Sequence, residues 1–445
     1  MSGGTDVLER VTDERATTTP LLDSFAERDD LPAWFREQQR AGWREFQKLP
    51  MPTRKEQVWR FANIDALKLD DYQRAPELTD DLRAELLERS TGFSEATARL
   101  IFADEQLVER DVIPDLLRER GVIFQPLDRA IIEHEDLVRE HFMAERATLG
   151  SAKFAALHRA FVSSGAFLYV PHGVEIELPV EIFHWLATPD AAVFPHLLLV
   201  AGELSKVTVV EHFRSAANAL GFACGVNDLI VGRGANVRYV CVQEWSERVV
   251  AVQVNATRVE RDASALSLNI NLGASYARFE SRSRLVGEGS RSDMLAIGVA
   301  TGRQEFDART LQDHECPHTT SDLLYKNALN DSARTTFGGL IRVEPHAHFT
   351  DAYQTVRNLL LSDDAEANSM PGLEILADNV KCSHGATSGQ IHEDELFYLL
   401  ARGIPKPIAQ QLLVQGFLNE VTDRLRHPAC EGLVRQAIEA KFAGR

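Results

Sequence analysis

The stretch from Phe167 to Ile391 constrains the fold of this chain most, because it consists of short β-rich segments and lacks a helical period. Segments such as "KVTVVEHF" (206–213) and "VRYVCVQEW" (237–245) are separated by Gly, Asn and Asp, which favour turns. A β region of this length must form a sandwich pair, a large barrel or a β-solenoid. Because Asn-Gly or Asp-Gly hairpin turns are missing between most segments, we favour stacked parallel coils, a β-helix spanning 165–391.

The regions on either side of this stretch differ from it in composition. Residues 1–25 are polar and predict a disordered tail, and 26–164 predict a mostly helical domain. In "TDDLRAELLERS" (79–90), Thr79 is a candidate N-cap, whereas "ARLIFA" (98–103) and "GVIFQPL" (121–127) could be strands. The fold class is therefore mainly β, with a helical or α+β N-terminal domain.

The last residues, 392–445, predict a C-terminal helical domain. Three acidic residues, 393–395, suit a helix N-terminus, and Gly403 suits a helix C-cap. One apolar stripe recurs at four-residue steps and consists of Leu413, Phe417, Val421 and Leu425. The spacing alone does not separate a partner-binding stripe from one that packs inside the domain.

Charge and cysteine content exclude several classes of protein. The formal net charge is −18, from 48 Lys and Arg against 66 Asp and Glu, which would repel phosphate backbones and argues against nucleic-acid binding. No apolar run approaches the roughly 20 residues of a membrane span, and the start has no apolar signal region, so we expect a cytoplasmic protein that does not enter a membrane. The five cysteines form no CxxC pair, so we expect reduced thiols.

Two histidine-containing segments suggest metal chemistry. "HECPH" places His314, Cys316 and His318 at alternating positions, but a closed tetrahedral site would still lack a fourth ligand. His346 and His348 resemble the start of a cupin metal site, which makes a cupin-like metal-dependent enzyme the alternative function. Buried His and Cys also commonly serve packing and hydrogen bonding, so both segments have a purely structural interpretation.

Cys382 and His384 are two residues apart in "VKCSHGATSG" (380–389). On an extended strand, residues two apart point to the same face at roughly 7 Å of strand length. The residues alone leave two interpretations open. Either the pair is a packed thiol and a hydrogen-bonded imidazole, or it is half of a metal site whose remaining ligands come from another subunit.

The segment "ANSMPGLEILADNVKCSHGATSGQIHEDELFYLLARGIP" (367–405) resembles the signature of the SufB/SufD family of iron–sulfur cluster assembly proteins, and is most similar to its SufD branch. Further similar segments are "GAFLYVPHGVEIELPVEI" (165–182), "HECPHTTSDLLYKNAL" (314–329) and "FTDAYQTVRNLLLS" (349–362). The segment "LPMPTRKEQVWRFANI" (49–64) also matches, although Met51 interrupts the usual order. The resemblance therefore extends from about residue 49 to 426.

This resemblance implies a right-handed parallel β-helix and a non-catalytic scaffold subunit of the SUF system. It also implies a heterodimer with a SufB-like subunit and a SufC-like ATPase docked on the C-terminal helical domain, where Phe397 and the stripe of residues 413–425 are the candidate contacts. His384 matches the histidine that faces the partner, and Cys382 lies in the same motif. Iron or a nascent iron–sulfur cluster is expected at the interface, no cofactor is expected on the subunit alone, and flavin binding is left open.

Overall fold

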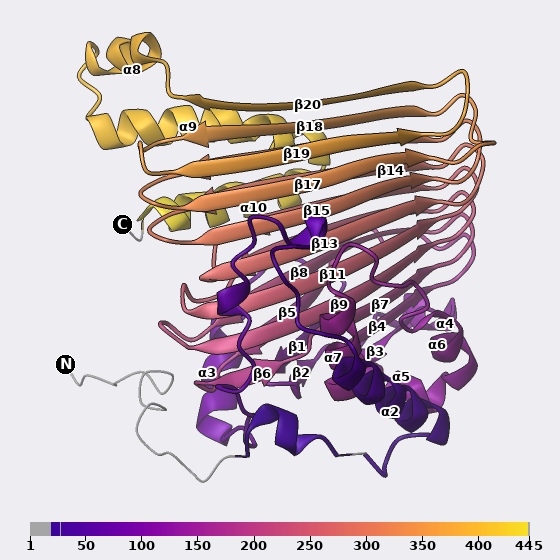
Figure 1. Ribbon diagram of the computed structural model, residues 1–445. Helices are drawn as coiled ribbons and strands as arrows, with labels where there is room; N and C mark the ends of the chain where they lie inside the picture. Colours follow the sequence, from indigo (N-terminus) through magenta and orange to yellow (C-terminus); the bar gives the residue numbers. More distant parts are fainter. Residues whose placement is uncertain (1–18, 27, 444–445) are drawn as a thin grey trace.

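Two long sheets face each other along most of the chain and form a parallel β-helix (Figure 1). The structure, a computed structural model, describes residues 19–26 and 28–443. We call the two sheets sheet I and sheet II. In spatial order, sheet I consists of β2 (Gln106–Arg110), β1 (Ala98–Ala103), β5 (Val180–Leu186), β8 (Lys206–Ser215), β10 (Asn236–Glu244), β12 (Ser264–Asn271), β14 (Arg291–Ala300), β16 (Thr320–Leu329), β18 (Asp351–Leu360) and β20 (Lys381–Gln390).

Sheet II runs in the opposite spatial order. It consists of β19 (Glu366–Ile375), β17 (Arg334–Val343), β15 (Glu305–His314), β13 (Tyr276–Leu285), β11 (Val249–Val259), β9 (Gly221–Val231), β7 (His196–Ala201), β4 (Ala166–Val170) and β3 (Ile123–Pro126), with β6 (Ala191–Val193) paired to β9. From β4 onward, successive strands alternate for the most part between the two sheets, and each pairs in parallel with the next strand of its own sheet. The predicted β-helix is therefore confirmed.

The length of a coil varies along the β-helix, which explains why the sequence shows no strict repeat. Ser264 pairs with Arg291, which is 27 residues further along the chain, whereas Thr320 pairs with Asp351, 31 residues further along. The strands keep an in-register ladder, so the differences are absorbed by the turns. A fixed period is the usual sequence signal of a repeat fold, and this chain lacks it.

The N-terminal region is less helical than predicted, because three of its strands join the two sheets. Its helices are α2 (Ala33–Lys48), α3 (Asp80–Arg89), α4 (Asp115–Glu119), α5 (Leu127–Glu133), α6 (Glu135–His141) and α7 (Ala152–Phe161). Thr79 caps α3 as predicted and accepts a hydrogen bond from the Leu82 N–H. Both expected segments are strands: β1 pairs in parallel with β5, and β3 pairs in antiparallel fashion with β4.

The predicted disordered tail of residues 1–25 is too long. Residues 1–18 lie outside the described part of the chain. Leu21–Ser24, however, form a short 3-10 helix in which Leu21 is buried and its N–H donates to the Tyr72 carbonyl. The ordered fold therefore begins before residue 25.

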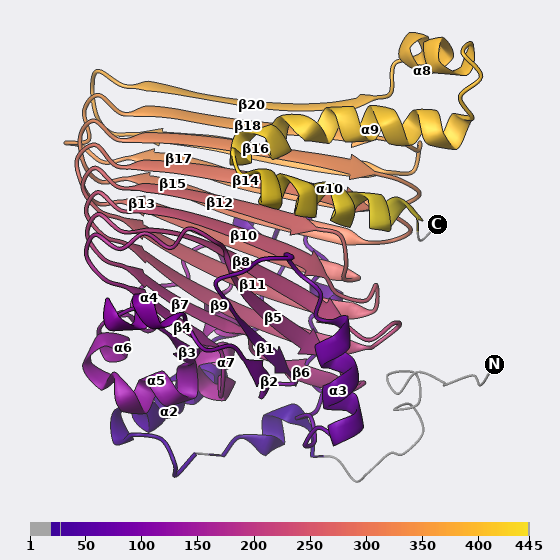
Figure 2. The ribbon, with the colours of Figure 1, turned by 180° about the vertical axis from the view of Figure 1, so that it is seen from behind.

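Three C-terminal helices follow the last strand, α8 (Glu393–Leu400), α9 (Lys406–Thr422) and α10 (Pro428–Ala443). Gly403 has φ +80°, the left-handed conformation expected after the end of α8. Helices α9 and α10 lie on the outer face of sheet I (Figure 2), where Val414, Leu418 and Val434 share one apolar cluster with strand residues such as Leu268. They are therefore part of the core of the β-helix and do not form a separate domain. No helix in the described part is long and apolar enough to cross a membrane.

A buried arginine holds the N-terminal segment on the outer face of sheet II. Arg278 of β13 is fully buried and forms ion pairs with Glu280 (2.7 Å) and Asp307 (2.5 Å). Its guanidinium also donates to the carbonyls of Val58 and Leu149, and its Cζ lies 3.6 Å from the centre of the Trp59 ring. One cation therefore satisfies two carboxylates and two segments of backbone.

Replacing Arg278 with Met should lower the free energy of unfolding by about 3–5 kcal/mol, because two carboxylates would remain buried without a cation. Urea unfolding followed by circular dichroism measures this change. Arg258→Met is the matched control, because Arg258 pairs with Glu260 at an exposed site of the same sheet and should cost less than about 1 kcal/mol. Equal losses in the two variants would contradict the importance of the buried cluster.

Candidate functional site at the end of the β-helix

Strand β20 directs Cys382 and His384 to the same face, as predicted. Cys382 pairs with Ala352 of β18, and His384 pairs with Gln354. Both partners are buried, and the same register row continues to Leu323 inside the β-helix. The thiol and the imidazole therefore extend from the rows of side chains that fill the interior.

No further coil covers these two side chains within the described residues. Strands β19 and β20 are the last strands of their sheets and form the upper end of the β-helix in Figure 1. In β20, Cys382 is half-buried and the other nine residues are exposed. The interior of the β-helix thus opens at this end, and Cys382 and His384 lie on its rim.

The two side chains differ in their surroundings. Cys382 packs against an apolar cluster that includes Ile341 and Val343, and burial, together with the nearby Asp351 carboxylate, raises the pKa of its thiol. His384 is exposed, and no described residue forms a hydrogen bond or ion pair with its ring. The imidazole is therefore available to an external ligand, whereas the thiol remains protonated at neutral pH until a metal displaces its proton.

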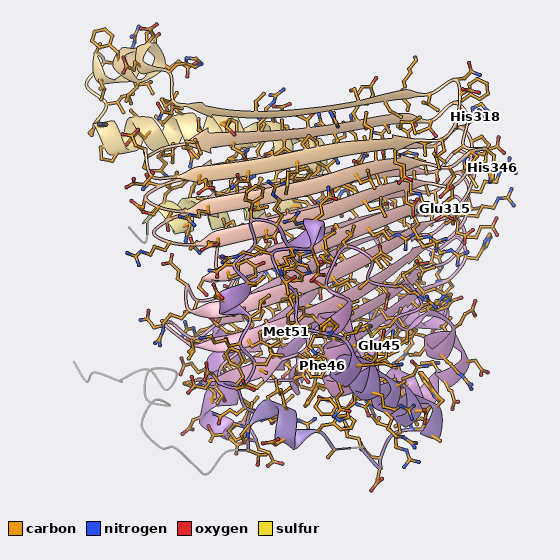
Figure 3. The ribbon with its side chains drawn as sticks, viewed as in Figure 1. Glu45, Phe46, Met51, Glu315, His318 and His346 are labelled. Atoms are coloured by element: carbon orange, nitrogen blue, oxygen red, sulfur yellow. The ribbon has the colours of Figure 1, made fainter. Side chains whose placement is uncertain are left out.

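The residues of "HECPH" do not come together. Both ring nitrogens of His314 are in hydrogen bonds, to Thr319 (2.7 Å) and Ser321 (2.8 Å), and burial lowers its pKa to about 3. The Cys316 thiol donates to the Val286 carbonyl, and His318 stacks on the Phe349 ring. Figure 3 shows His318 at the turns along one side of the β-helix. This segment thus follows the structural interpretation.

The cupin-like alternative is wrong, because the strands form an open stack of coils and not a closed barrel. His346 and His348 lie in the turn between β17 and β18, and His346 is labelled beside the other turns in Figure 3. The Nδ1 of His348 lies 2.9 Å from the Asp378 carbonyl. Among the described residues, no group of three or more His, Cys, Asp or Glu side chains could hold a metal ion.

Half of the predicted partner-binding stripe is inaccessible. Val421 and Leu425 are fully buried against the outer face of sheet I, and Leu413 and Phe417 are half-buried. The prediction failed for the two buried residues because helical spacing identifies an apolar face but not what covers it. Phe397, in contrast, is 70% exposed on α8, a helix in which no residue is buried.

A buried polar cluster inside the first coils was not predicted. Glu211 accepts hydrogen bonds from the Tyr239 hydroxyl (2.7 Å) and the Asn227 amide, and its other oxygen lies 2.9 Å from Nε2 of His184. The available signal was a carboxylate and an imidazole, Glu211 and His212, in the middle of an apolar strand sequence. Because each carboxylate oxygen has a partner, the cluster serves to hold neighbouring coils together.

Comparison with known proteins identifies the family. Residues 184–417 match the SUF system FeS cluster assembly, SufBD core domain, and residues 28–182 match the SufBD protein N-terminal region. The chain belongs to the SufBD family. The family boundary falls within β5, so the strands β1–β3 that begin the sheets belong to the N-terminal region of the SufBD family.

Relatives of both types occur among proteins similar to this SufBD chain. It is 31% identical over 427 residues to the iron–sulfur cluster assembly protein SufD of Bacillus subtilis (strain 168), with 94% of this chain and 95% of the relative covered. It is 26% identical to SufB of the same organism, with 93% and 90% covered. A SufBD family protein of Staphylococcus epidermidis (strain ATCC 12228 / FDA PCI 1200) is 27% identical, with 93% and 90% covered.

The raised pKa of Cys382 predicts how fast its thiol is alkylated. Since only the thiolate reacts, modification by iodoacetamide should be slow at pH 7 and should rise by about tenfold per pH unit to above pH 9. Peptide mass spectrometry measures the rate at each pH. The buried Cys224, Cys241 and Cys430 are internal controls that should remain unmodified in the folded protein. A rate that levels off below pH 8 would contradict the raised pKa.

Proposed function

We propose that this chain is a non-catalytic SufD-like subunit of the SUF iron–sulfur cluster assembly complex. In this proposal it pairs with a SufB-like subunit, docks a SufC-like ATPase, and supports iron entry and formation of the nascent cluster, which is the cargo of the complex. The observation that carries the proposal is the position of Cys382 and His384 on the rim of the open end of the β-helix.

The open end is suited to pairing with a second β-helix. The outer edges of β19 and β20 have no strand partner among the described residues, although each strand is ten residues long. Long unpaired edges are a liability in a protein that acts alone, and native proteins normally cover or charge them. A partner coil placed on this end would pair the free backbone groups and enclose the two side chains.

Two ligands on one strand make half of a metal site. Iron and sulfide chemistry uses thiolate and imidazole ligands, and a complete site needs about four of them. Cys382 and His384 provide two, so the remaining ligands would come from the SufB-like partner. His384 ranks above Cys382, because an exposed neutral imidazole binds a metal without the deprotonation that the half-buried thiol requires.

Replacing His384 with Ala should leave the fold and the heterodimer intact, whereas cluster assembly in cells should fall by about tenfold or more. Complementation of a strain that lacks this subunit measures assembly, and co-purification followed by iron and sulfide analysis measures the cargo. Cys382→Ser should cause a smaller loss. Ser383→Ala is the matched control, because Ser383 is exposed between them on the opposite face of β20. Full complementation by the Ala variant would reject the shared site.

Helix α8 is the surface that best suits an ATPase subunit. It extends beyond the stacked coils in Figures 1 and 2, and it carries Phe397 (70% exposed) and Tyr398 (56% exposed). Ile408 and Leu412 of the adjacent α9 are also exposed. Exposed aromatic residues next to aliphatic ones are typical of protein–protein interfaces.

Phe397→Ala should weaken capture of the SufC-like ATPase by about tenfold or more, because a large aromatic anchor would be lost. Pull-down and calorimetry with the purified ATPase measure the change. Leu116→Ala is the matched control, since Leu116 of α4 is also 70% exposed but lies in the N-terminal region. Unchanged capture by the Phe397 variant would move the docking surface away from α8. Truncation after Ile391 is unsuitable for this test, because α9 and α10 cover the apolar face of sheet I.

A further inference from the structure

A groove of about 500 Å³ lies where the turn between α9 and α10 crosses the outer face of sheet I. Strands β10, β12, β14 and β16 supply its floor, and Arg424, Leu425 and Arg426 supply its wall. Figure 2 shows this turn over the middle of the sheet, on the face that carries α9 and α10. The groove is thus remote from α8 and distinct from the rim with Cys382 and His384.

The groove concentrates positive charge in a strongly acidic protein. Four arginines line it, against only two carboxylates, so its lining carries two net positive charges. Both carboxylates are already neutralised by neighbours. Arg291 forms a bidentate pair with Asp293 (2.7 and 2.8 Å), and Arg424 pairs with Asp322.

The other two arginines, Arg238 and Arg426, have no carboxylate partner among the described residues. Nη1 of Arg238 donates to the Thr208 hydroxyl at 3.2 Å, but its Nε is buried without a hydrogen-bond partner. Such a buried donor costs about 1–3 kcal/mol unless an acceptor reaches it. Arg426 is exposed at the wall and forms no hydrogen bond or ion pair with the described part of the chain.

Further positive charge lies around Arg238, so the absence of a carboxylate is not compensated nearby. Burial lowers the pKa of Arg238, and burial followed by the charges of Arg238 and Lys206 lowers the pKa of His427. Glu431 acts in the opposite direction on His427 but is a weaker influence. An anion in the groove would relieve this unfavourable arrangement of like charges.

We propose that this groove binds a small phosphorylated ligand. A phosphate group carries a charge of about −1.5 to −2 at neutral pH, which matches the two unpaired guanidinium groups. The fork of N–H donors on arginine fits phosphate oxygens in a bidentate manner. The volume falls within the roughly 300–1,000 Å³ of small-molecule sites, which leaves room for more than one phosphate or for an attached organic group. The site is independent of the subunit pairing proposed above.

Calorimetric titration of the full chain with pyrophosphate and with adenosine diphosphate tests this site. We expect saturable binding of at least one probe, with affinity that falls as salt increases. Arg238→Gln keeps a donor for Thr208 but removes the charge, and should weaken binding by about tenfold or more. Arg426→Gly should do the same, and glycine is compatible with the φ of +49° at this position.

Arg233→Gln is the matched control, because Arg233 is an exposed arginine outside the groove and its loss should leave binding unchanged. Circular dichroism and thermal unfolding show whether each variant folds as the wild type does, and the two variants are on different elements. The proposal is overturned if neither probe binds saturably, if both groove variants bind as tightly as the control, or if an acidic peptide binds in place of both probes.

Discussion

Backbone pairing between successive coils is the interaction on which the rest of this structure depends. Each strand of a β-helix satisfies its N–H and C=O groups through the coils before and after it, so no coil is complete alone. At the first end this need is met from within the chain, because β2 pairs with β1 and β3 pairs with β4, both in antiparallel fashion. At the last end, β19 and β20 have neighbours on one side only.

The two ends of the chain solve a second problem, which is the apolar outer face of each sheet. On sheet II, helix α7 and the segment around Trp59 cover residues such as Phe222 and Val252, and the buried charge of Arg278 holds that segment in place. On sheet I, α9 and α10 cover Leu268 and its neighbours. The helices are thus required by the coils they cover, and the groove beside Arg426 exists only because a helical turn crosses a flat sheet.

Local periodicity predicted most of the fold and part of the site. Alternation along one strand was sufficient to place Cys382 and His384 on the same face, and the Thr79 cap followed from its position before a helical sequence. Features that depend on contacts between distant segments were beyond reach. The groove unites residues from four strands with a turn near residue 425, and burial of Val421 depends on a sheet more than 100 residues earlier. The varying coil length likewise hid the repeat, because the turns absorb it.

The difference between the two ends also determines the size of any assembly built from this chain. A rod whose coils were exposed at both ends could add subunits at each end without limit and would grow into a filament. Here the strands and helices of the N-terminal region occupy one end, so stacking can occur only at the end formed by β19 and β20 (Figure 1). Addition of a single partner with the same polarity uses up the remaining edge, and growth stops at two rods.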